Sequence, residues 1–282
     1  MAIVKPMETG LMFWAGNSAA GTLDKVKSYG LHNGQLGLGP DVDLVKALPD
    51  WQAVQPGSGV VLTAAVCSYA GEDYADMERV HESVGFTTPK YRAERIARTK
   101  AVADFANELG IKAVSCHIGF IPGVPSESLY AELIAVTREI CDSCAERAQT
   151  FVLETGQESA AVLLGFLLDV DRTNLKVNFD PANMVLYGSG DPVEALNLLR
   201  DWVLSVHCKD GHLPTAAGML GSECRLGDGD VDFPSFLAEL KSMGYAGPLT
   251  IEREEPDAAQ QSADVRTAVE RLAQWKAKAG IA

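Results

Sequence analysis

Four side chains that can bind a metal or move a proton each stand at the end of a short apolar run. Glu154 follows FVL, Asp180 follows LKVNF, His207 follows VLSV and Glu252 follows PLTI. The gaps are 26 (154 to 180), 27 (180 to 207) and 45 (207 to 252), which correspond to one strand–helix unit each, the last with an extra loop at 212–229. Neighbouring strands lie about 4.8 Å apart. The spacing therefore predicts that the four side chains converge on one ion.

These residues are three carboxylates and one imidazole, which together offer a hard, mostly oxygen ligand set. Such a set suits Mn²⁺, Mg²⁺ or Co²⁺ better than a structural zinc ion, which favours Cys and His. Each residue taken alone reads more readily as a polar strand end that caps a loop or pairs with a base. Because all four stand at the same position relative to their predicted strands, we expect them to bind one divalent metal ion. Mn²⁺ is the first choice, with Mg²⁺, Co²⁺ or Zn²⁺ as alternatives.

The elements that must position these residues alternate between strand-like and helix-like segments. Strands are expected at 11–15, 31–38, 60–67, 111–116, 151–153, 175–179, 203–206 and 249–251. Helices are expected at 22–28, 41–54, 91–109, 126–148, 159–168, 192–199, from 233 onwards, and at 258–278. The alternation predicts parallel strands with crossover helices, and the count of eight predicts an α/β fold, a (β/α)8 TIM barrel in a single domain over 1–282. An open doubly wound sheet is the alternative if the first two, weakest strands fail.

Several local features follow from the same pass along the chain. Thr22 is expected to cap the first helix, and Asp191 the helix that begins with Pro192. Residues 69–89 are expected to form a long loop with a short helix, and 180–183 a tight turn. A long loop in a compact domain often serves a binding site.

Composition narrows the class of protein. The chain has 47% hydrophobic and 22% charged residues, as in ordinary globular proteins, and a net charge of −14. The acidic balance argues against nucleic acid, whose binding depends on Lys and Arg. No stretch reaches the roughly 20 apolar residues of a membrane span, and the first residues lack the apolar core of a signal peptide. We therefore expect a cytoplasmic protein with no membrane partner.

The six cysteines are expected to be reduced. Cys67, Cys116 and Cys208 stand in strand-like runs and are predicted to be small core residues. Cys141 and Cys144 form a C-x-x-C pattern inside a helical segment without a second pair, which favours a helix face over a zinc or redox site.

Five segments give the chain a family resemblance. They are HIGFIPG (117–123), LETG (153–156), NFDPANM (178–184), VHCKDG (206–211) and LGDGDVDFPSFLAELKSMGYAGPLTIE (226–252). On these segments the chain resembles the sugar phosphate isomerase/epimerase family of xylose isomerase-like TIM barrels, the AP endonuclease 2 superfamily. That superfamily includes ketose 3-epimerases, inosose dehydratases and a zinc-dependent nuclease branch. The likeness covers the C-terminal two-thirds, whereas the first 60 residues match only in strand–helix rhythm.

The resemblance implies roles for individual residues. It makes Glu154, Asp180, His207 and Glu252 the metal ligands, with Glu154 and Glu252 also the catalytic acid/base pair. It matches positions near the substrate in the family to four further residues, His117, Asn183, Lys209 and Arg225. For each of these a structural role is the alternative: a strand end, a turn, an ion pair or a solvated loop. The nuclease branch needs more histidines than this chain offers, and Asn183 stands where one of its ligands would be.

The predicted reaction begins with removal of a proton next to the carbonyl of a keto sugar, through a metal-stabilised cis-enediolate. Return of the proton gives an epimer or an isomer, and loss of a neighbouring group would make the protein a dehydratase or lyase acting on a keto sugar or inosose. Phe120 could form an apolar wall against the sugar ring, as could Trp14, for which a place in the core is the alternative. Lys209 and Arg225 are the obvious candidates for binding a phosphate, which needs several convergent donors. An unphosphorylated sugar or cyclitol is therefore favoured. A non-catalytic sugar-binding barrel and a homodimer or homotetramer stay open.

Overall fold

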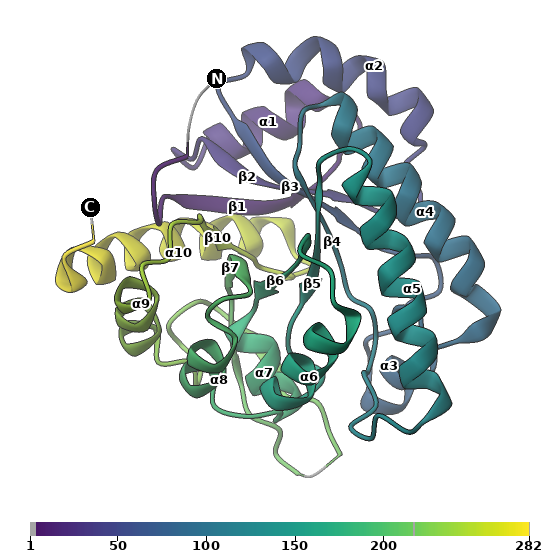
Figure 1. The fold of residues 1–282 in the computed structure, drawn as a ribbon. Coiled ribbons are helices and arrows are strands. Elements are labelled where there is room, and N and C mark those ends of the chain that lie inside the picture. The colour runs from purple at the N-terminus through teal and green to yellow at the C-terminus, as the bar shows by residue number, and fades with distance from the viewer. Residues whose placement is uncertain (1–3, 217, 282) are drawn as a thin grey trace.

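The computed structural model describes residues 4–216 and 218–281 (Figure 1). Within these residues, eight parallel strands close into a barrel in the order β1-β10-β7-β6-β5-β4-β3-β2. They are β1 (Thr9–Trp14), β2 (Asn33–Leu38), β3 (Val61–Cys67), β4 (Ala113–Cys116), β5 (Thr150–Glu154), β6 (Leu175–Phe179), β7 (Val203–Cys208) and β10 (Leu249–Ile251). The predicted closed (β/α)8 barrel is confirmed. The open sheet is excluded because β1 pairs with both β2 and β10.

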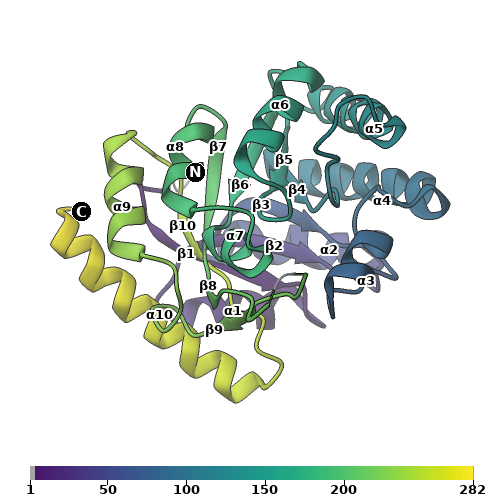
Figure 2. The same ribbon diagram turned by 90° about the horizontal axis from the view of Figure 1, so that it is seen from below.

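Helices surround the barrel, as the view along it shows (Figure 2). They are α1 (Ala19–Lys27), α2 (Leu44–Val54), α3 (Met77–Ser83), α4 (Pro89–Glu108), α5 (Ser128–Ala145), α6 (Ala160–Val170), α7 (Pro181–Tyr187), α8 (Pro192–Leu199), α9 (Phe233–Ser242) and α10 (Ala258–Ala279), with the 3-10 turn η1 (Gln55–Gly57) after α2. The main core lies between strands and helices, where side chains such as Leu36, Phe179 and Phe236 are fully buried. No helix among the described residues has the length and apolar content needed to cross a membrane.

The interior of the barrel differs from this outer core. A small apolar cluster of Ala64, Ala113 and Val152 fills part of it. Buried polar side chains, among them Gln35 and Asn178, occupy another part. Buried polar groups are normally hydrogen-bonded. Gln35 accordingly donates to Asn178, and its oxygen lies beside the imidazole of His207.

Two local predictions are wrong. Helix α1 begins at Ala19 with Ser18 as its cap, which accepts a hydrogen bond from the Gly21 amide, whereas Thr22 lies inside the helix. Ser18 stands earlier in the chain and its oxygen reaches the free amides of the first turn. The expected tight turn at 180–183 is the start of helix α7, because the Asp180 carboxylate accepts from the Asn183 amide and Pro181 follows at the first helical position. By contrast, Asp191 caps α8 as predicted.

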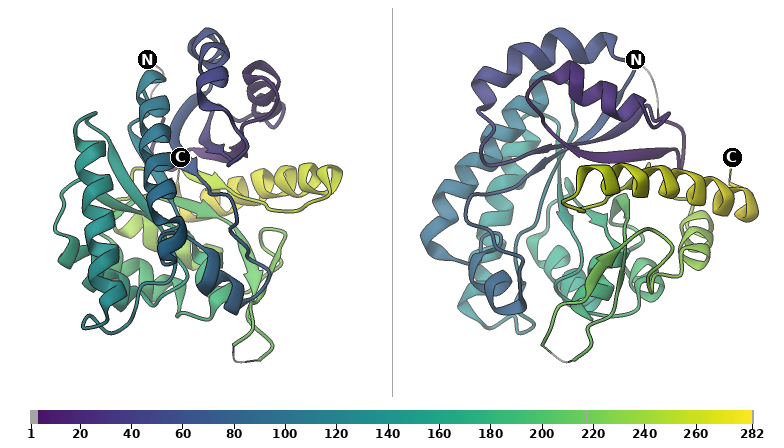
Figure 3. Two further views of the ribbon diagram at one scale, coloured as in Figure 1. Left: turned by 90° about the vertical axis from the view of Figure 1, so that its right-hand side faces the viewer. Right: turned by 180° about the vertical axis from the view of Figure 1, so that it is seen from behind.

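The extra loop after β7 contains an antiparallel hairpin, β8 (Asp210–His212) with β9 (Ser222–Cys224), where the sequence predicts only a loop. Figure 3 shows this hairpin projecting beyond the barrel. The Asp210 carboxylate holds the returning chain by accepting from the amides of Gly227 (2.7 Å), Gly229 (3.0 Å) and Val231 (3.2 Å). A Cβ at position 229 would lie 2.2 Å from Asp210 Oδ1, so that turn requires glycine.

The segment 69–89 is a long excursion with the short helix α3, as predicted. Arg95 of α4 fixes it from below by donating to the carbonyl oxygens of Ser83 (2.6 Å), Ala70 (3.1 Å) and Gly85. Cys67, Cys116 and Cys208 are buried in strands, and Cys141 and Cys144 are buried on α5, which confirms their predicted positions. The reduced state of the thiols stays a prediction.

Candidate active site

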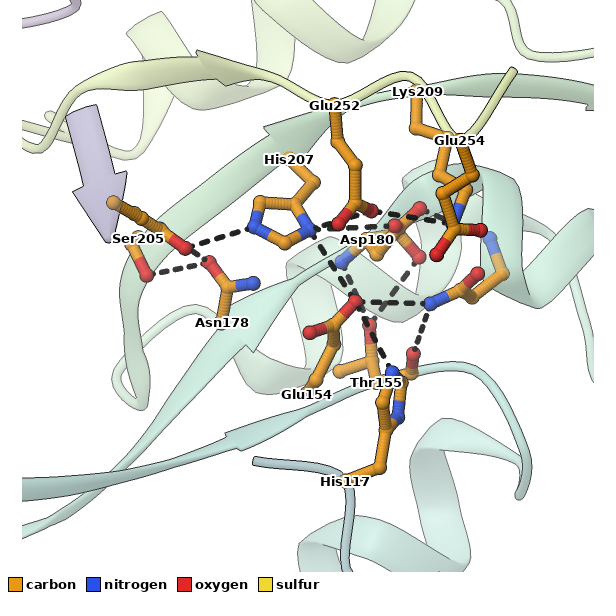
Figure 4. A network of polar contacts seen from close by, with 12 residues as sticks. His117, Glu154, Thr155, Asn178, Asp180, Ser205, His207, Lys209, Glu252 and Glu254 are labelled. Carbon is orange, nitrogen blue, oxygen red and sulfur yellow. Dashed lines mark hydrogen bonds and ion pairs between the residues drawn. The ribbon is translucent and has the colours of Figure 1, made fainter. Parts of the chain in front are cut away.

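Four ligand atoms meet at the carboxyl ends of β5, β6, β7 and β10. Glu154, Asp180, His207 and Glu252 each contribute one nitrogen or oxygen, and these atoms all lie within 4.8 Å of one another (Figure 4). The four strands are consecutive neighbours in the barrel. The convergence expected from the sequence spacing is therefore present in the fold.

His207 Nδ1 stands at the centre of this cluster. It lies 3.1 Å from Glu252 Oε2, 3.3 Å from Glu154 Oε1 and 3.5 Å from Asp180 Oδ2. The side chains of His207 and Asp180 are fully buried, with 0% exposed, whereas 10% of Glu252 is exposed. Three carboxylates around one nitrogen would repel one another strongly unless a positive charge lies among them.

The hydrogen-bond inventory tests whether these residues fit a divalent cation. Among the described residues, Asp180 Oδ2, His207 Nδ1 and Glu252 Oε2 are buried and make no well-formed hydrogen bond, although the Lys209 ammonium lies 3.2 Å from Glu252 Oε2. Leaving a buried polar atom unsatisfied costs about 1–3 kcal/mol, and more for a charged group. Three such atoms in one cluster of oxygen and imidazole donors match the coordination chemistry of a hard divalent ion. The residues present therefore fit the predicted metal.

The polar layer inside the barrel orients the imidazole. Gln35 Oε1 lies 2.9 Å from His207 Nε2, and Gln35 Nε2 donates to Asn178 Oδ1 at 3.3 Å. Ser205 Oγ also donates to Asn178 Oδ1, at 2.5 Å. Because the Gln35 oxygen is an acceptor, it selects the tautomer with hydrogen on Nε2 and leaves Nδ1 free to bind a metal. The sequence analysis did not predict this role, although Gln35 in the run 31–38 and Asn178 in the run 175–179 are polar residues in otherwise apolar strands.

Burial and charge shift the pKa values in opposite directions. Burial lowers the pKa of His207, but the Glu252 and Glu154 carboxylates outweigh it and raise that pKa well above its usual range. Burial raises the pKa of Glu154, but His117 and His207 outweigh it, so that the pKa lies below the ordinary value. Without a metal, the proton on His207 offsets part of the carboxylate repulsion. A cation binding at Nδ1 would displace that proton.

A cavity of about 400 Å³ opens over the cluster. Glu154 and Glu252 line it, whereas Asp180 and His207 are fully buried. The other lining residues are Met12, Trp14, Val66, Cys67, Ser68, Tyr69, Glu72, Tyr74, His117, Asn183, Leu186, Tyr187, Lys209, Leu220, Gly221 and Glu254. The volume falls within the roughly 300–1,000 Å³ of small-molecule sites. Of the four cluster residues, the two glutamates are thus the ones placed to touch a ligand.

Three residues that the sequence assigned to the substrate lie in this cavity and contact the glutamates. His117 Nε2 is 3.5 Å from Glu154 Oε1, and the side-chain Nδ2 of Asn183 donates to the same oxygen at 3.2 Å. Lys209 Nζ is 3.2 Å from Glu252 Oε2. Each catalytic candidate therefore has its own set of polar neighbours.

Two other predicted residues are placed elsewhere. Arg225 pairs with Asp228, at 2.8 Å between Nε and Oδ2, and is not among the described residues that line the cavity. Phe120 is likewise outside that lining, since it stacks on His81 with ring centroids 3.5 Å apart and meets the edge of Tyr187 at 5.8 Å. Phe120 thus supports Tyr187, which does line the cavity. Loop residues depend on where the loop turns, which spacing does not report.

Several lining residues escaped the sequence reading. Glu72 is held by the amides of Tyr69 (3.1 Å) and Gly85 (2.9 Å), and burial raises the pKa of its carboxyl. Glu254 accepts from Lys209 Nζ at 2.8 Å. The signals were a glutamate inside the long loop 69–89 and a second acidic residue two positions after Glu252. Neither is distinguishable by type alone from an exposed carboxylate.

A family model described as a xylose isomerase-like TIM barrel matches residues 52–275. The chain belongs to that family. A solved xylose isomerase domain protein from Planctomyces limnophilus is 36% identical, with a TM-score of 0.90 over 98% of this chain and 99% of that one. The family resemblance found in the sequence is therefore confirmed.

Relatives with named activities lie further away. An L-ribulose 3-epimerase from Methylomonas sp. (strain DH-1) is 27% identical over 278 residues, covering 89% of this chain and 86% of its own. A D-allulose 3-epimerase from Methylomonas sp., solved in complex with D-allulose, shares the fold at 19% identity, with a TM-score of 0.70 over 97% of this chain and 99% of that one. The first of these relatives supports an enzyme of the isomerase and epimerase class, and the second shows the shared fold.

Proposed function

We propose that this protein is a divalent-metal-dependent sugar epimerase or isomerase that moves a proton at the carbon next to the carbonyl of a keto sugar. The observation that carries the proposal is the arrangement of the four cluster residues: Glu154, Asp180, His207 and Glu252 converge within 4.8 Å, and the two glutamates line the cavity above. The epimerase relatives support the same class of reaction.

Glu154, Asp180, His207 and Glu252 would hold the ion, with Mn²⁺ the first choice for this ligand set. When bound, a divalent ion would polarise the carbonyl and stabilise the negative charge that develops on deprotonation, a contribution of several kcal/mol. Gln35 keeps the imidazole in the tautomer that can serve as a ligand.

Proton transfer falls to the two glutamates. Glu154 comes from β5 and Glu252 follows β10, at the two ends of the arc of four strands. A ligand between them would meet one carboxylate on each side, so that one oxygen removes the proton and the other returns one. Asn183 holds the Glu154 carboxylate and Lys209 holds that of Glu252, and both contacts restrict the glutamates to one orientation.

The charge of the cavity points to a neutral substrate. Four carboxylates line it, those of Glu72, Glu154, Glu252 and Glu254. Lys209 is the lysine in that lining, and its ammonium group is already paired with Glu252 and Glu254. A phosphate needs convergent donors and cations. We therefore propose an unphosphorylated keto sugar or cyclitol, with a cytoplasmic location and a homodimer or homotetramer remaining predictions.

The test is deuterium exchange in D2O with the Mn²⁺-loaded protein and a panel of ketoses, ring-keto sugars and inososes. Deuterium at the carbon next to the carbonyl of a recovered sugar supports the proposal, and the stereochemistry of the product separates epimerase from isomerase. An unsaturated product would instead assign a dehydratase or lyase. Bound metal with no exchange on any member of the panel would overturn the enzymatic proposal and favour a sugar-binding barrel.

A further inference from the structure

A second cavity, of about 500 Å³, adjoins the first at the carboxyl end of β1. Residues of β1, α1 and the segment from the end of β10 into α10 line it. It shares Met12, Trp14, Glu252 and Glu254 with the cavity above the metal cluster. A molecule seated over the cluster therefore has a neighbouring space that the proposed reaction on a single sugar ring does not use.

Trp14 stands at the junction of the two cavities. Its side chain is large and apolar, yet 49% of the residue is exposed. Gly37 on the adjacent strand makes room for the indole, because a Cβ there would lie 2.5 Å from Trp14 Cε3. An indole seated in this way offers a fixed apolar face, which suits the C–H face of a sugar ring at low entropic cost.

Both apolar and polar side chains line the second cavity. Its apolar lining includes Leu11, Phe13, Val26, Tyr29 and Val265, and its polar lining includes Asn17, Ser18, Thr22, Lys25, Arg253 and Gln261 beside the shared Glu252 and Glu254. A pocket for a small molecule commonly has this combination of an apolar wall and a few polar groups that fix orientation. A second sugar ring has the same mixed character.

The charged groups of this cavity are of both signs: Lys25 and Arg253 line it together with the carboxylates of Glu252 and Glu254. Arg253 is neutralised by Asp264 (2.9 Å), Glu223 (3.0 Å) and Glu255 (3.0 Å). Lys25 donates to the neutral Gln261 side chain at 3.2 Å, across the space between α1 and α10. The available groups are donors and acceptors for hydroxyls, so the cavity does not select for a strongly anionic ligand.

From these observations we propose that the substrate is a glycosylated keto sugar, whose second sugar ring occupies the cavity beside Trp14. This inference rests on the proposed function, since the keto ring must sit over Glu154 and Glu252. The glycosidic bond is neither made nor broken: one proton leaves the carbon next to the carbonyl and one returns. The carbonyl must stay free, so the second ring is attached at a carbon other than the carbonyl carbon.

The experiment compares pairs of substrates that share one keto sugar, with and without a second glucosyl ring. The measured quantity is the ratio of kcat/KM for deuterium exchange, glycosylated over unglycosylated, in the Mn²⁺-loaded protein. We expect a ratio of about ten or more, the size of effect that one or two well-made polar contacts give. A ratio near one or below, with exchange on the single sugar intact, overturns the inference and leaves the proposed function standing.

A matched pair of variants on α1 tests the position of the second ring. Lys25 lines the cavity, whereas Lys27 pairs with Asp24 at 2.8 Å and is not among the described residues of that lining. Lys25→Ala should lower the ratio about fivefold to tenfold, and Lys27→Ala should leave it unchanged. Equal effects of the two substitutions contradict the assignment. Melting temperatures of both variants show whether either one has disturbed the fold.

Two further arms complete the test. A phenyl glycoside of the same keto sugar replaces the second sugar by an apolar ring, and a higher kcat/KM for it than for the glucosyl compound would overturn the choice of a sugar. Calorimetric binding of the same pairs needs no turnover. Tighter binding of the glycosylated member without any exchange would sustain the second cavity as a sugar subsite while the proposed reaction fails. Equal binding with no exchange would overturn both.

Discussion

The two halves of the barrel rim contribute different things to the site. Strands β5, β6, β7 and β10 deliver the ionisable cluster, each from a position at its carboxyl end. Strands β1 to β4 and the segments that follow them deliver groups outside the cluster of four ligands, namely Trp14, the supporting Gln35, Glu72 of the 69–89 excursion and His117. One half therefore concentrates charge at a point, and the other shapes the space around that point. The first task needs strand geometry, whereas the second can be carried out by loops.

The largest effect should follow removal of a proton-transfer group in the charged half. We expect Glu154→Gln and Glu252→Gln each to lower the rate of deuterium exchange by about 10²- to 10⁴-fold, since an amide cannot take up the proton. The exposed Glu270→Gln on α10 is the control and should keep the parent rate. Substantial exchange in either active-site variant would mean that the base lies elsewhere.

Asp180→Asn tests the same half through metal binding. The asparagine still caps α7, so the fold should persist, but a charged ligand is lost. Affinity for Mn²⁺ in calorimetry should fall by more than the roughly 10- to 100-fold that loss of an outer contact costs. In the parent, metal at 100 times its dissociation constant should raise the free energy of unfolding by about 2.7 kcal/mol. Unchanged affinity and an unchanged metal-induced rise in melting temperature would exclude Asp180 as a ligand.

Gln35→Met tests whether the half of the rim formed by β1 to β4 affects metal binding at the cluster. This substitution removes the acceptor 2.9 Å from His207 Nε2. The imidazole then loses its fixed tautomer, and we expect metal affinity to fall roughly 10- to 100-fold. Gln52→Met, on the exposed surface of α2, should change nothing. If both variants bind Mn²⁺ as the parent does, the interior polar layer serves stability alone.

The smallest expected effect is a pH-dependent change in stability on substitution of Glu72, in the half of the rim formed by β1 to β4. Burial raises the pKa of Glu72 in the folded chain. The folded state then holds this proton more tightly than the unfolded state, so the contribution of Glu72 to stability falls as pH rises from the unfolded pKa through the folded one. Glu72→Gln should therefore compare more favourably with the parent in melting temperature at about pH 7 than at about pH 4. Glu78→Gln, exposed on α3, should show no such pH dependence.

The same contrast explains what the sequence could reveal. The period of a strand–helix unit located Glu154, Asp180, His207 and Glu252, because strand ends in a closed parallel barrel occupy equivalent positions. Elements with strong local patterns, such as β6 and α8, were found at the correct residues. The regular strand–helix period is therefore what allowed the four ligand residues to be predicted from the sequence.

The other site residues lie in irregular segments, whose course the sequence does not predict. The β8–β9 hairpin is built from two three-residue strands, too short for a strand pattern to show in the sequence. Asp210 fixes the chain that returns from it through contacts with amides 17 to 21 residues away. Arg225 was assigned from the family resemblance and Phe120 by residue type, but their partners, Asp228 and His81, depend on how their loops turn. Glu72 reaches the cavity for the same kind of reason, through backbone contacts within its loop.

The central claim is that the charged half of the rim builds one metal site from four strands. Crystals grown with Mn²⁺ and measured at the manganese absorption edge test it most directly. The account predicts a single anomalous peak within bonding distance of Glu154, Asp180, His207 and Glu252, with the Gln35 hydrogen bond to His207 intact. A peak held by other residues, or none at this position in the presence of excess Mn²⁺, would contradict it.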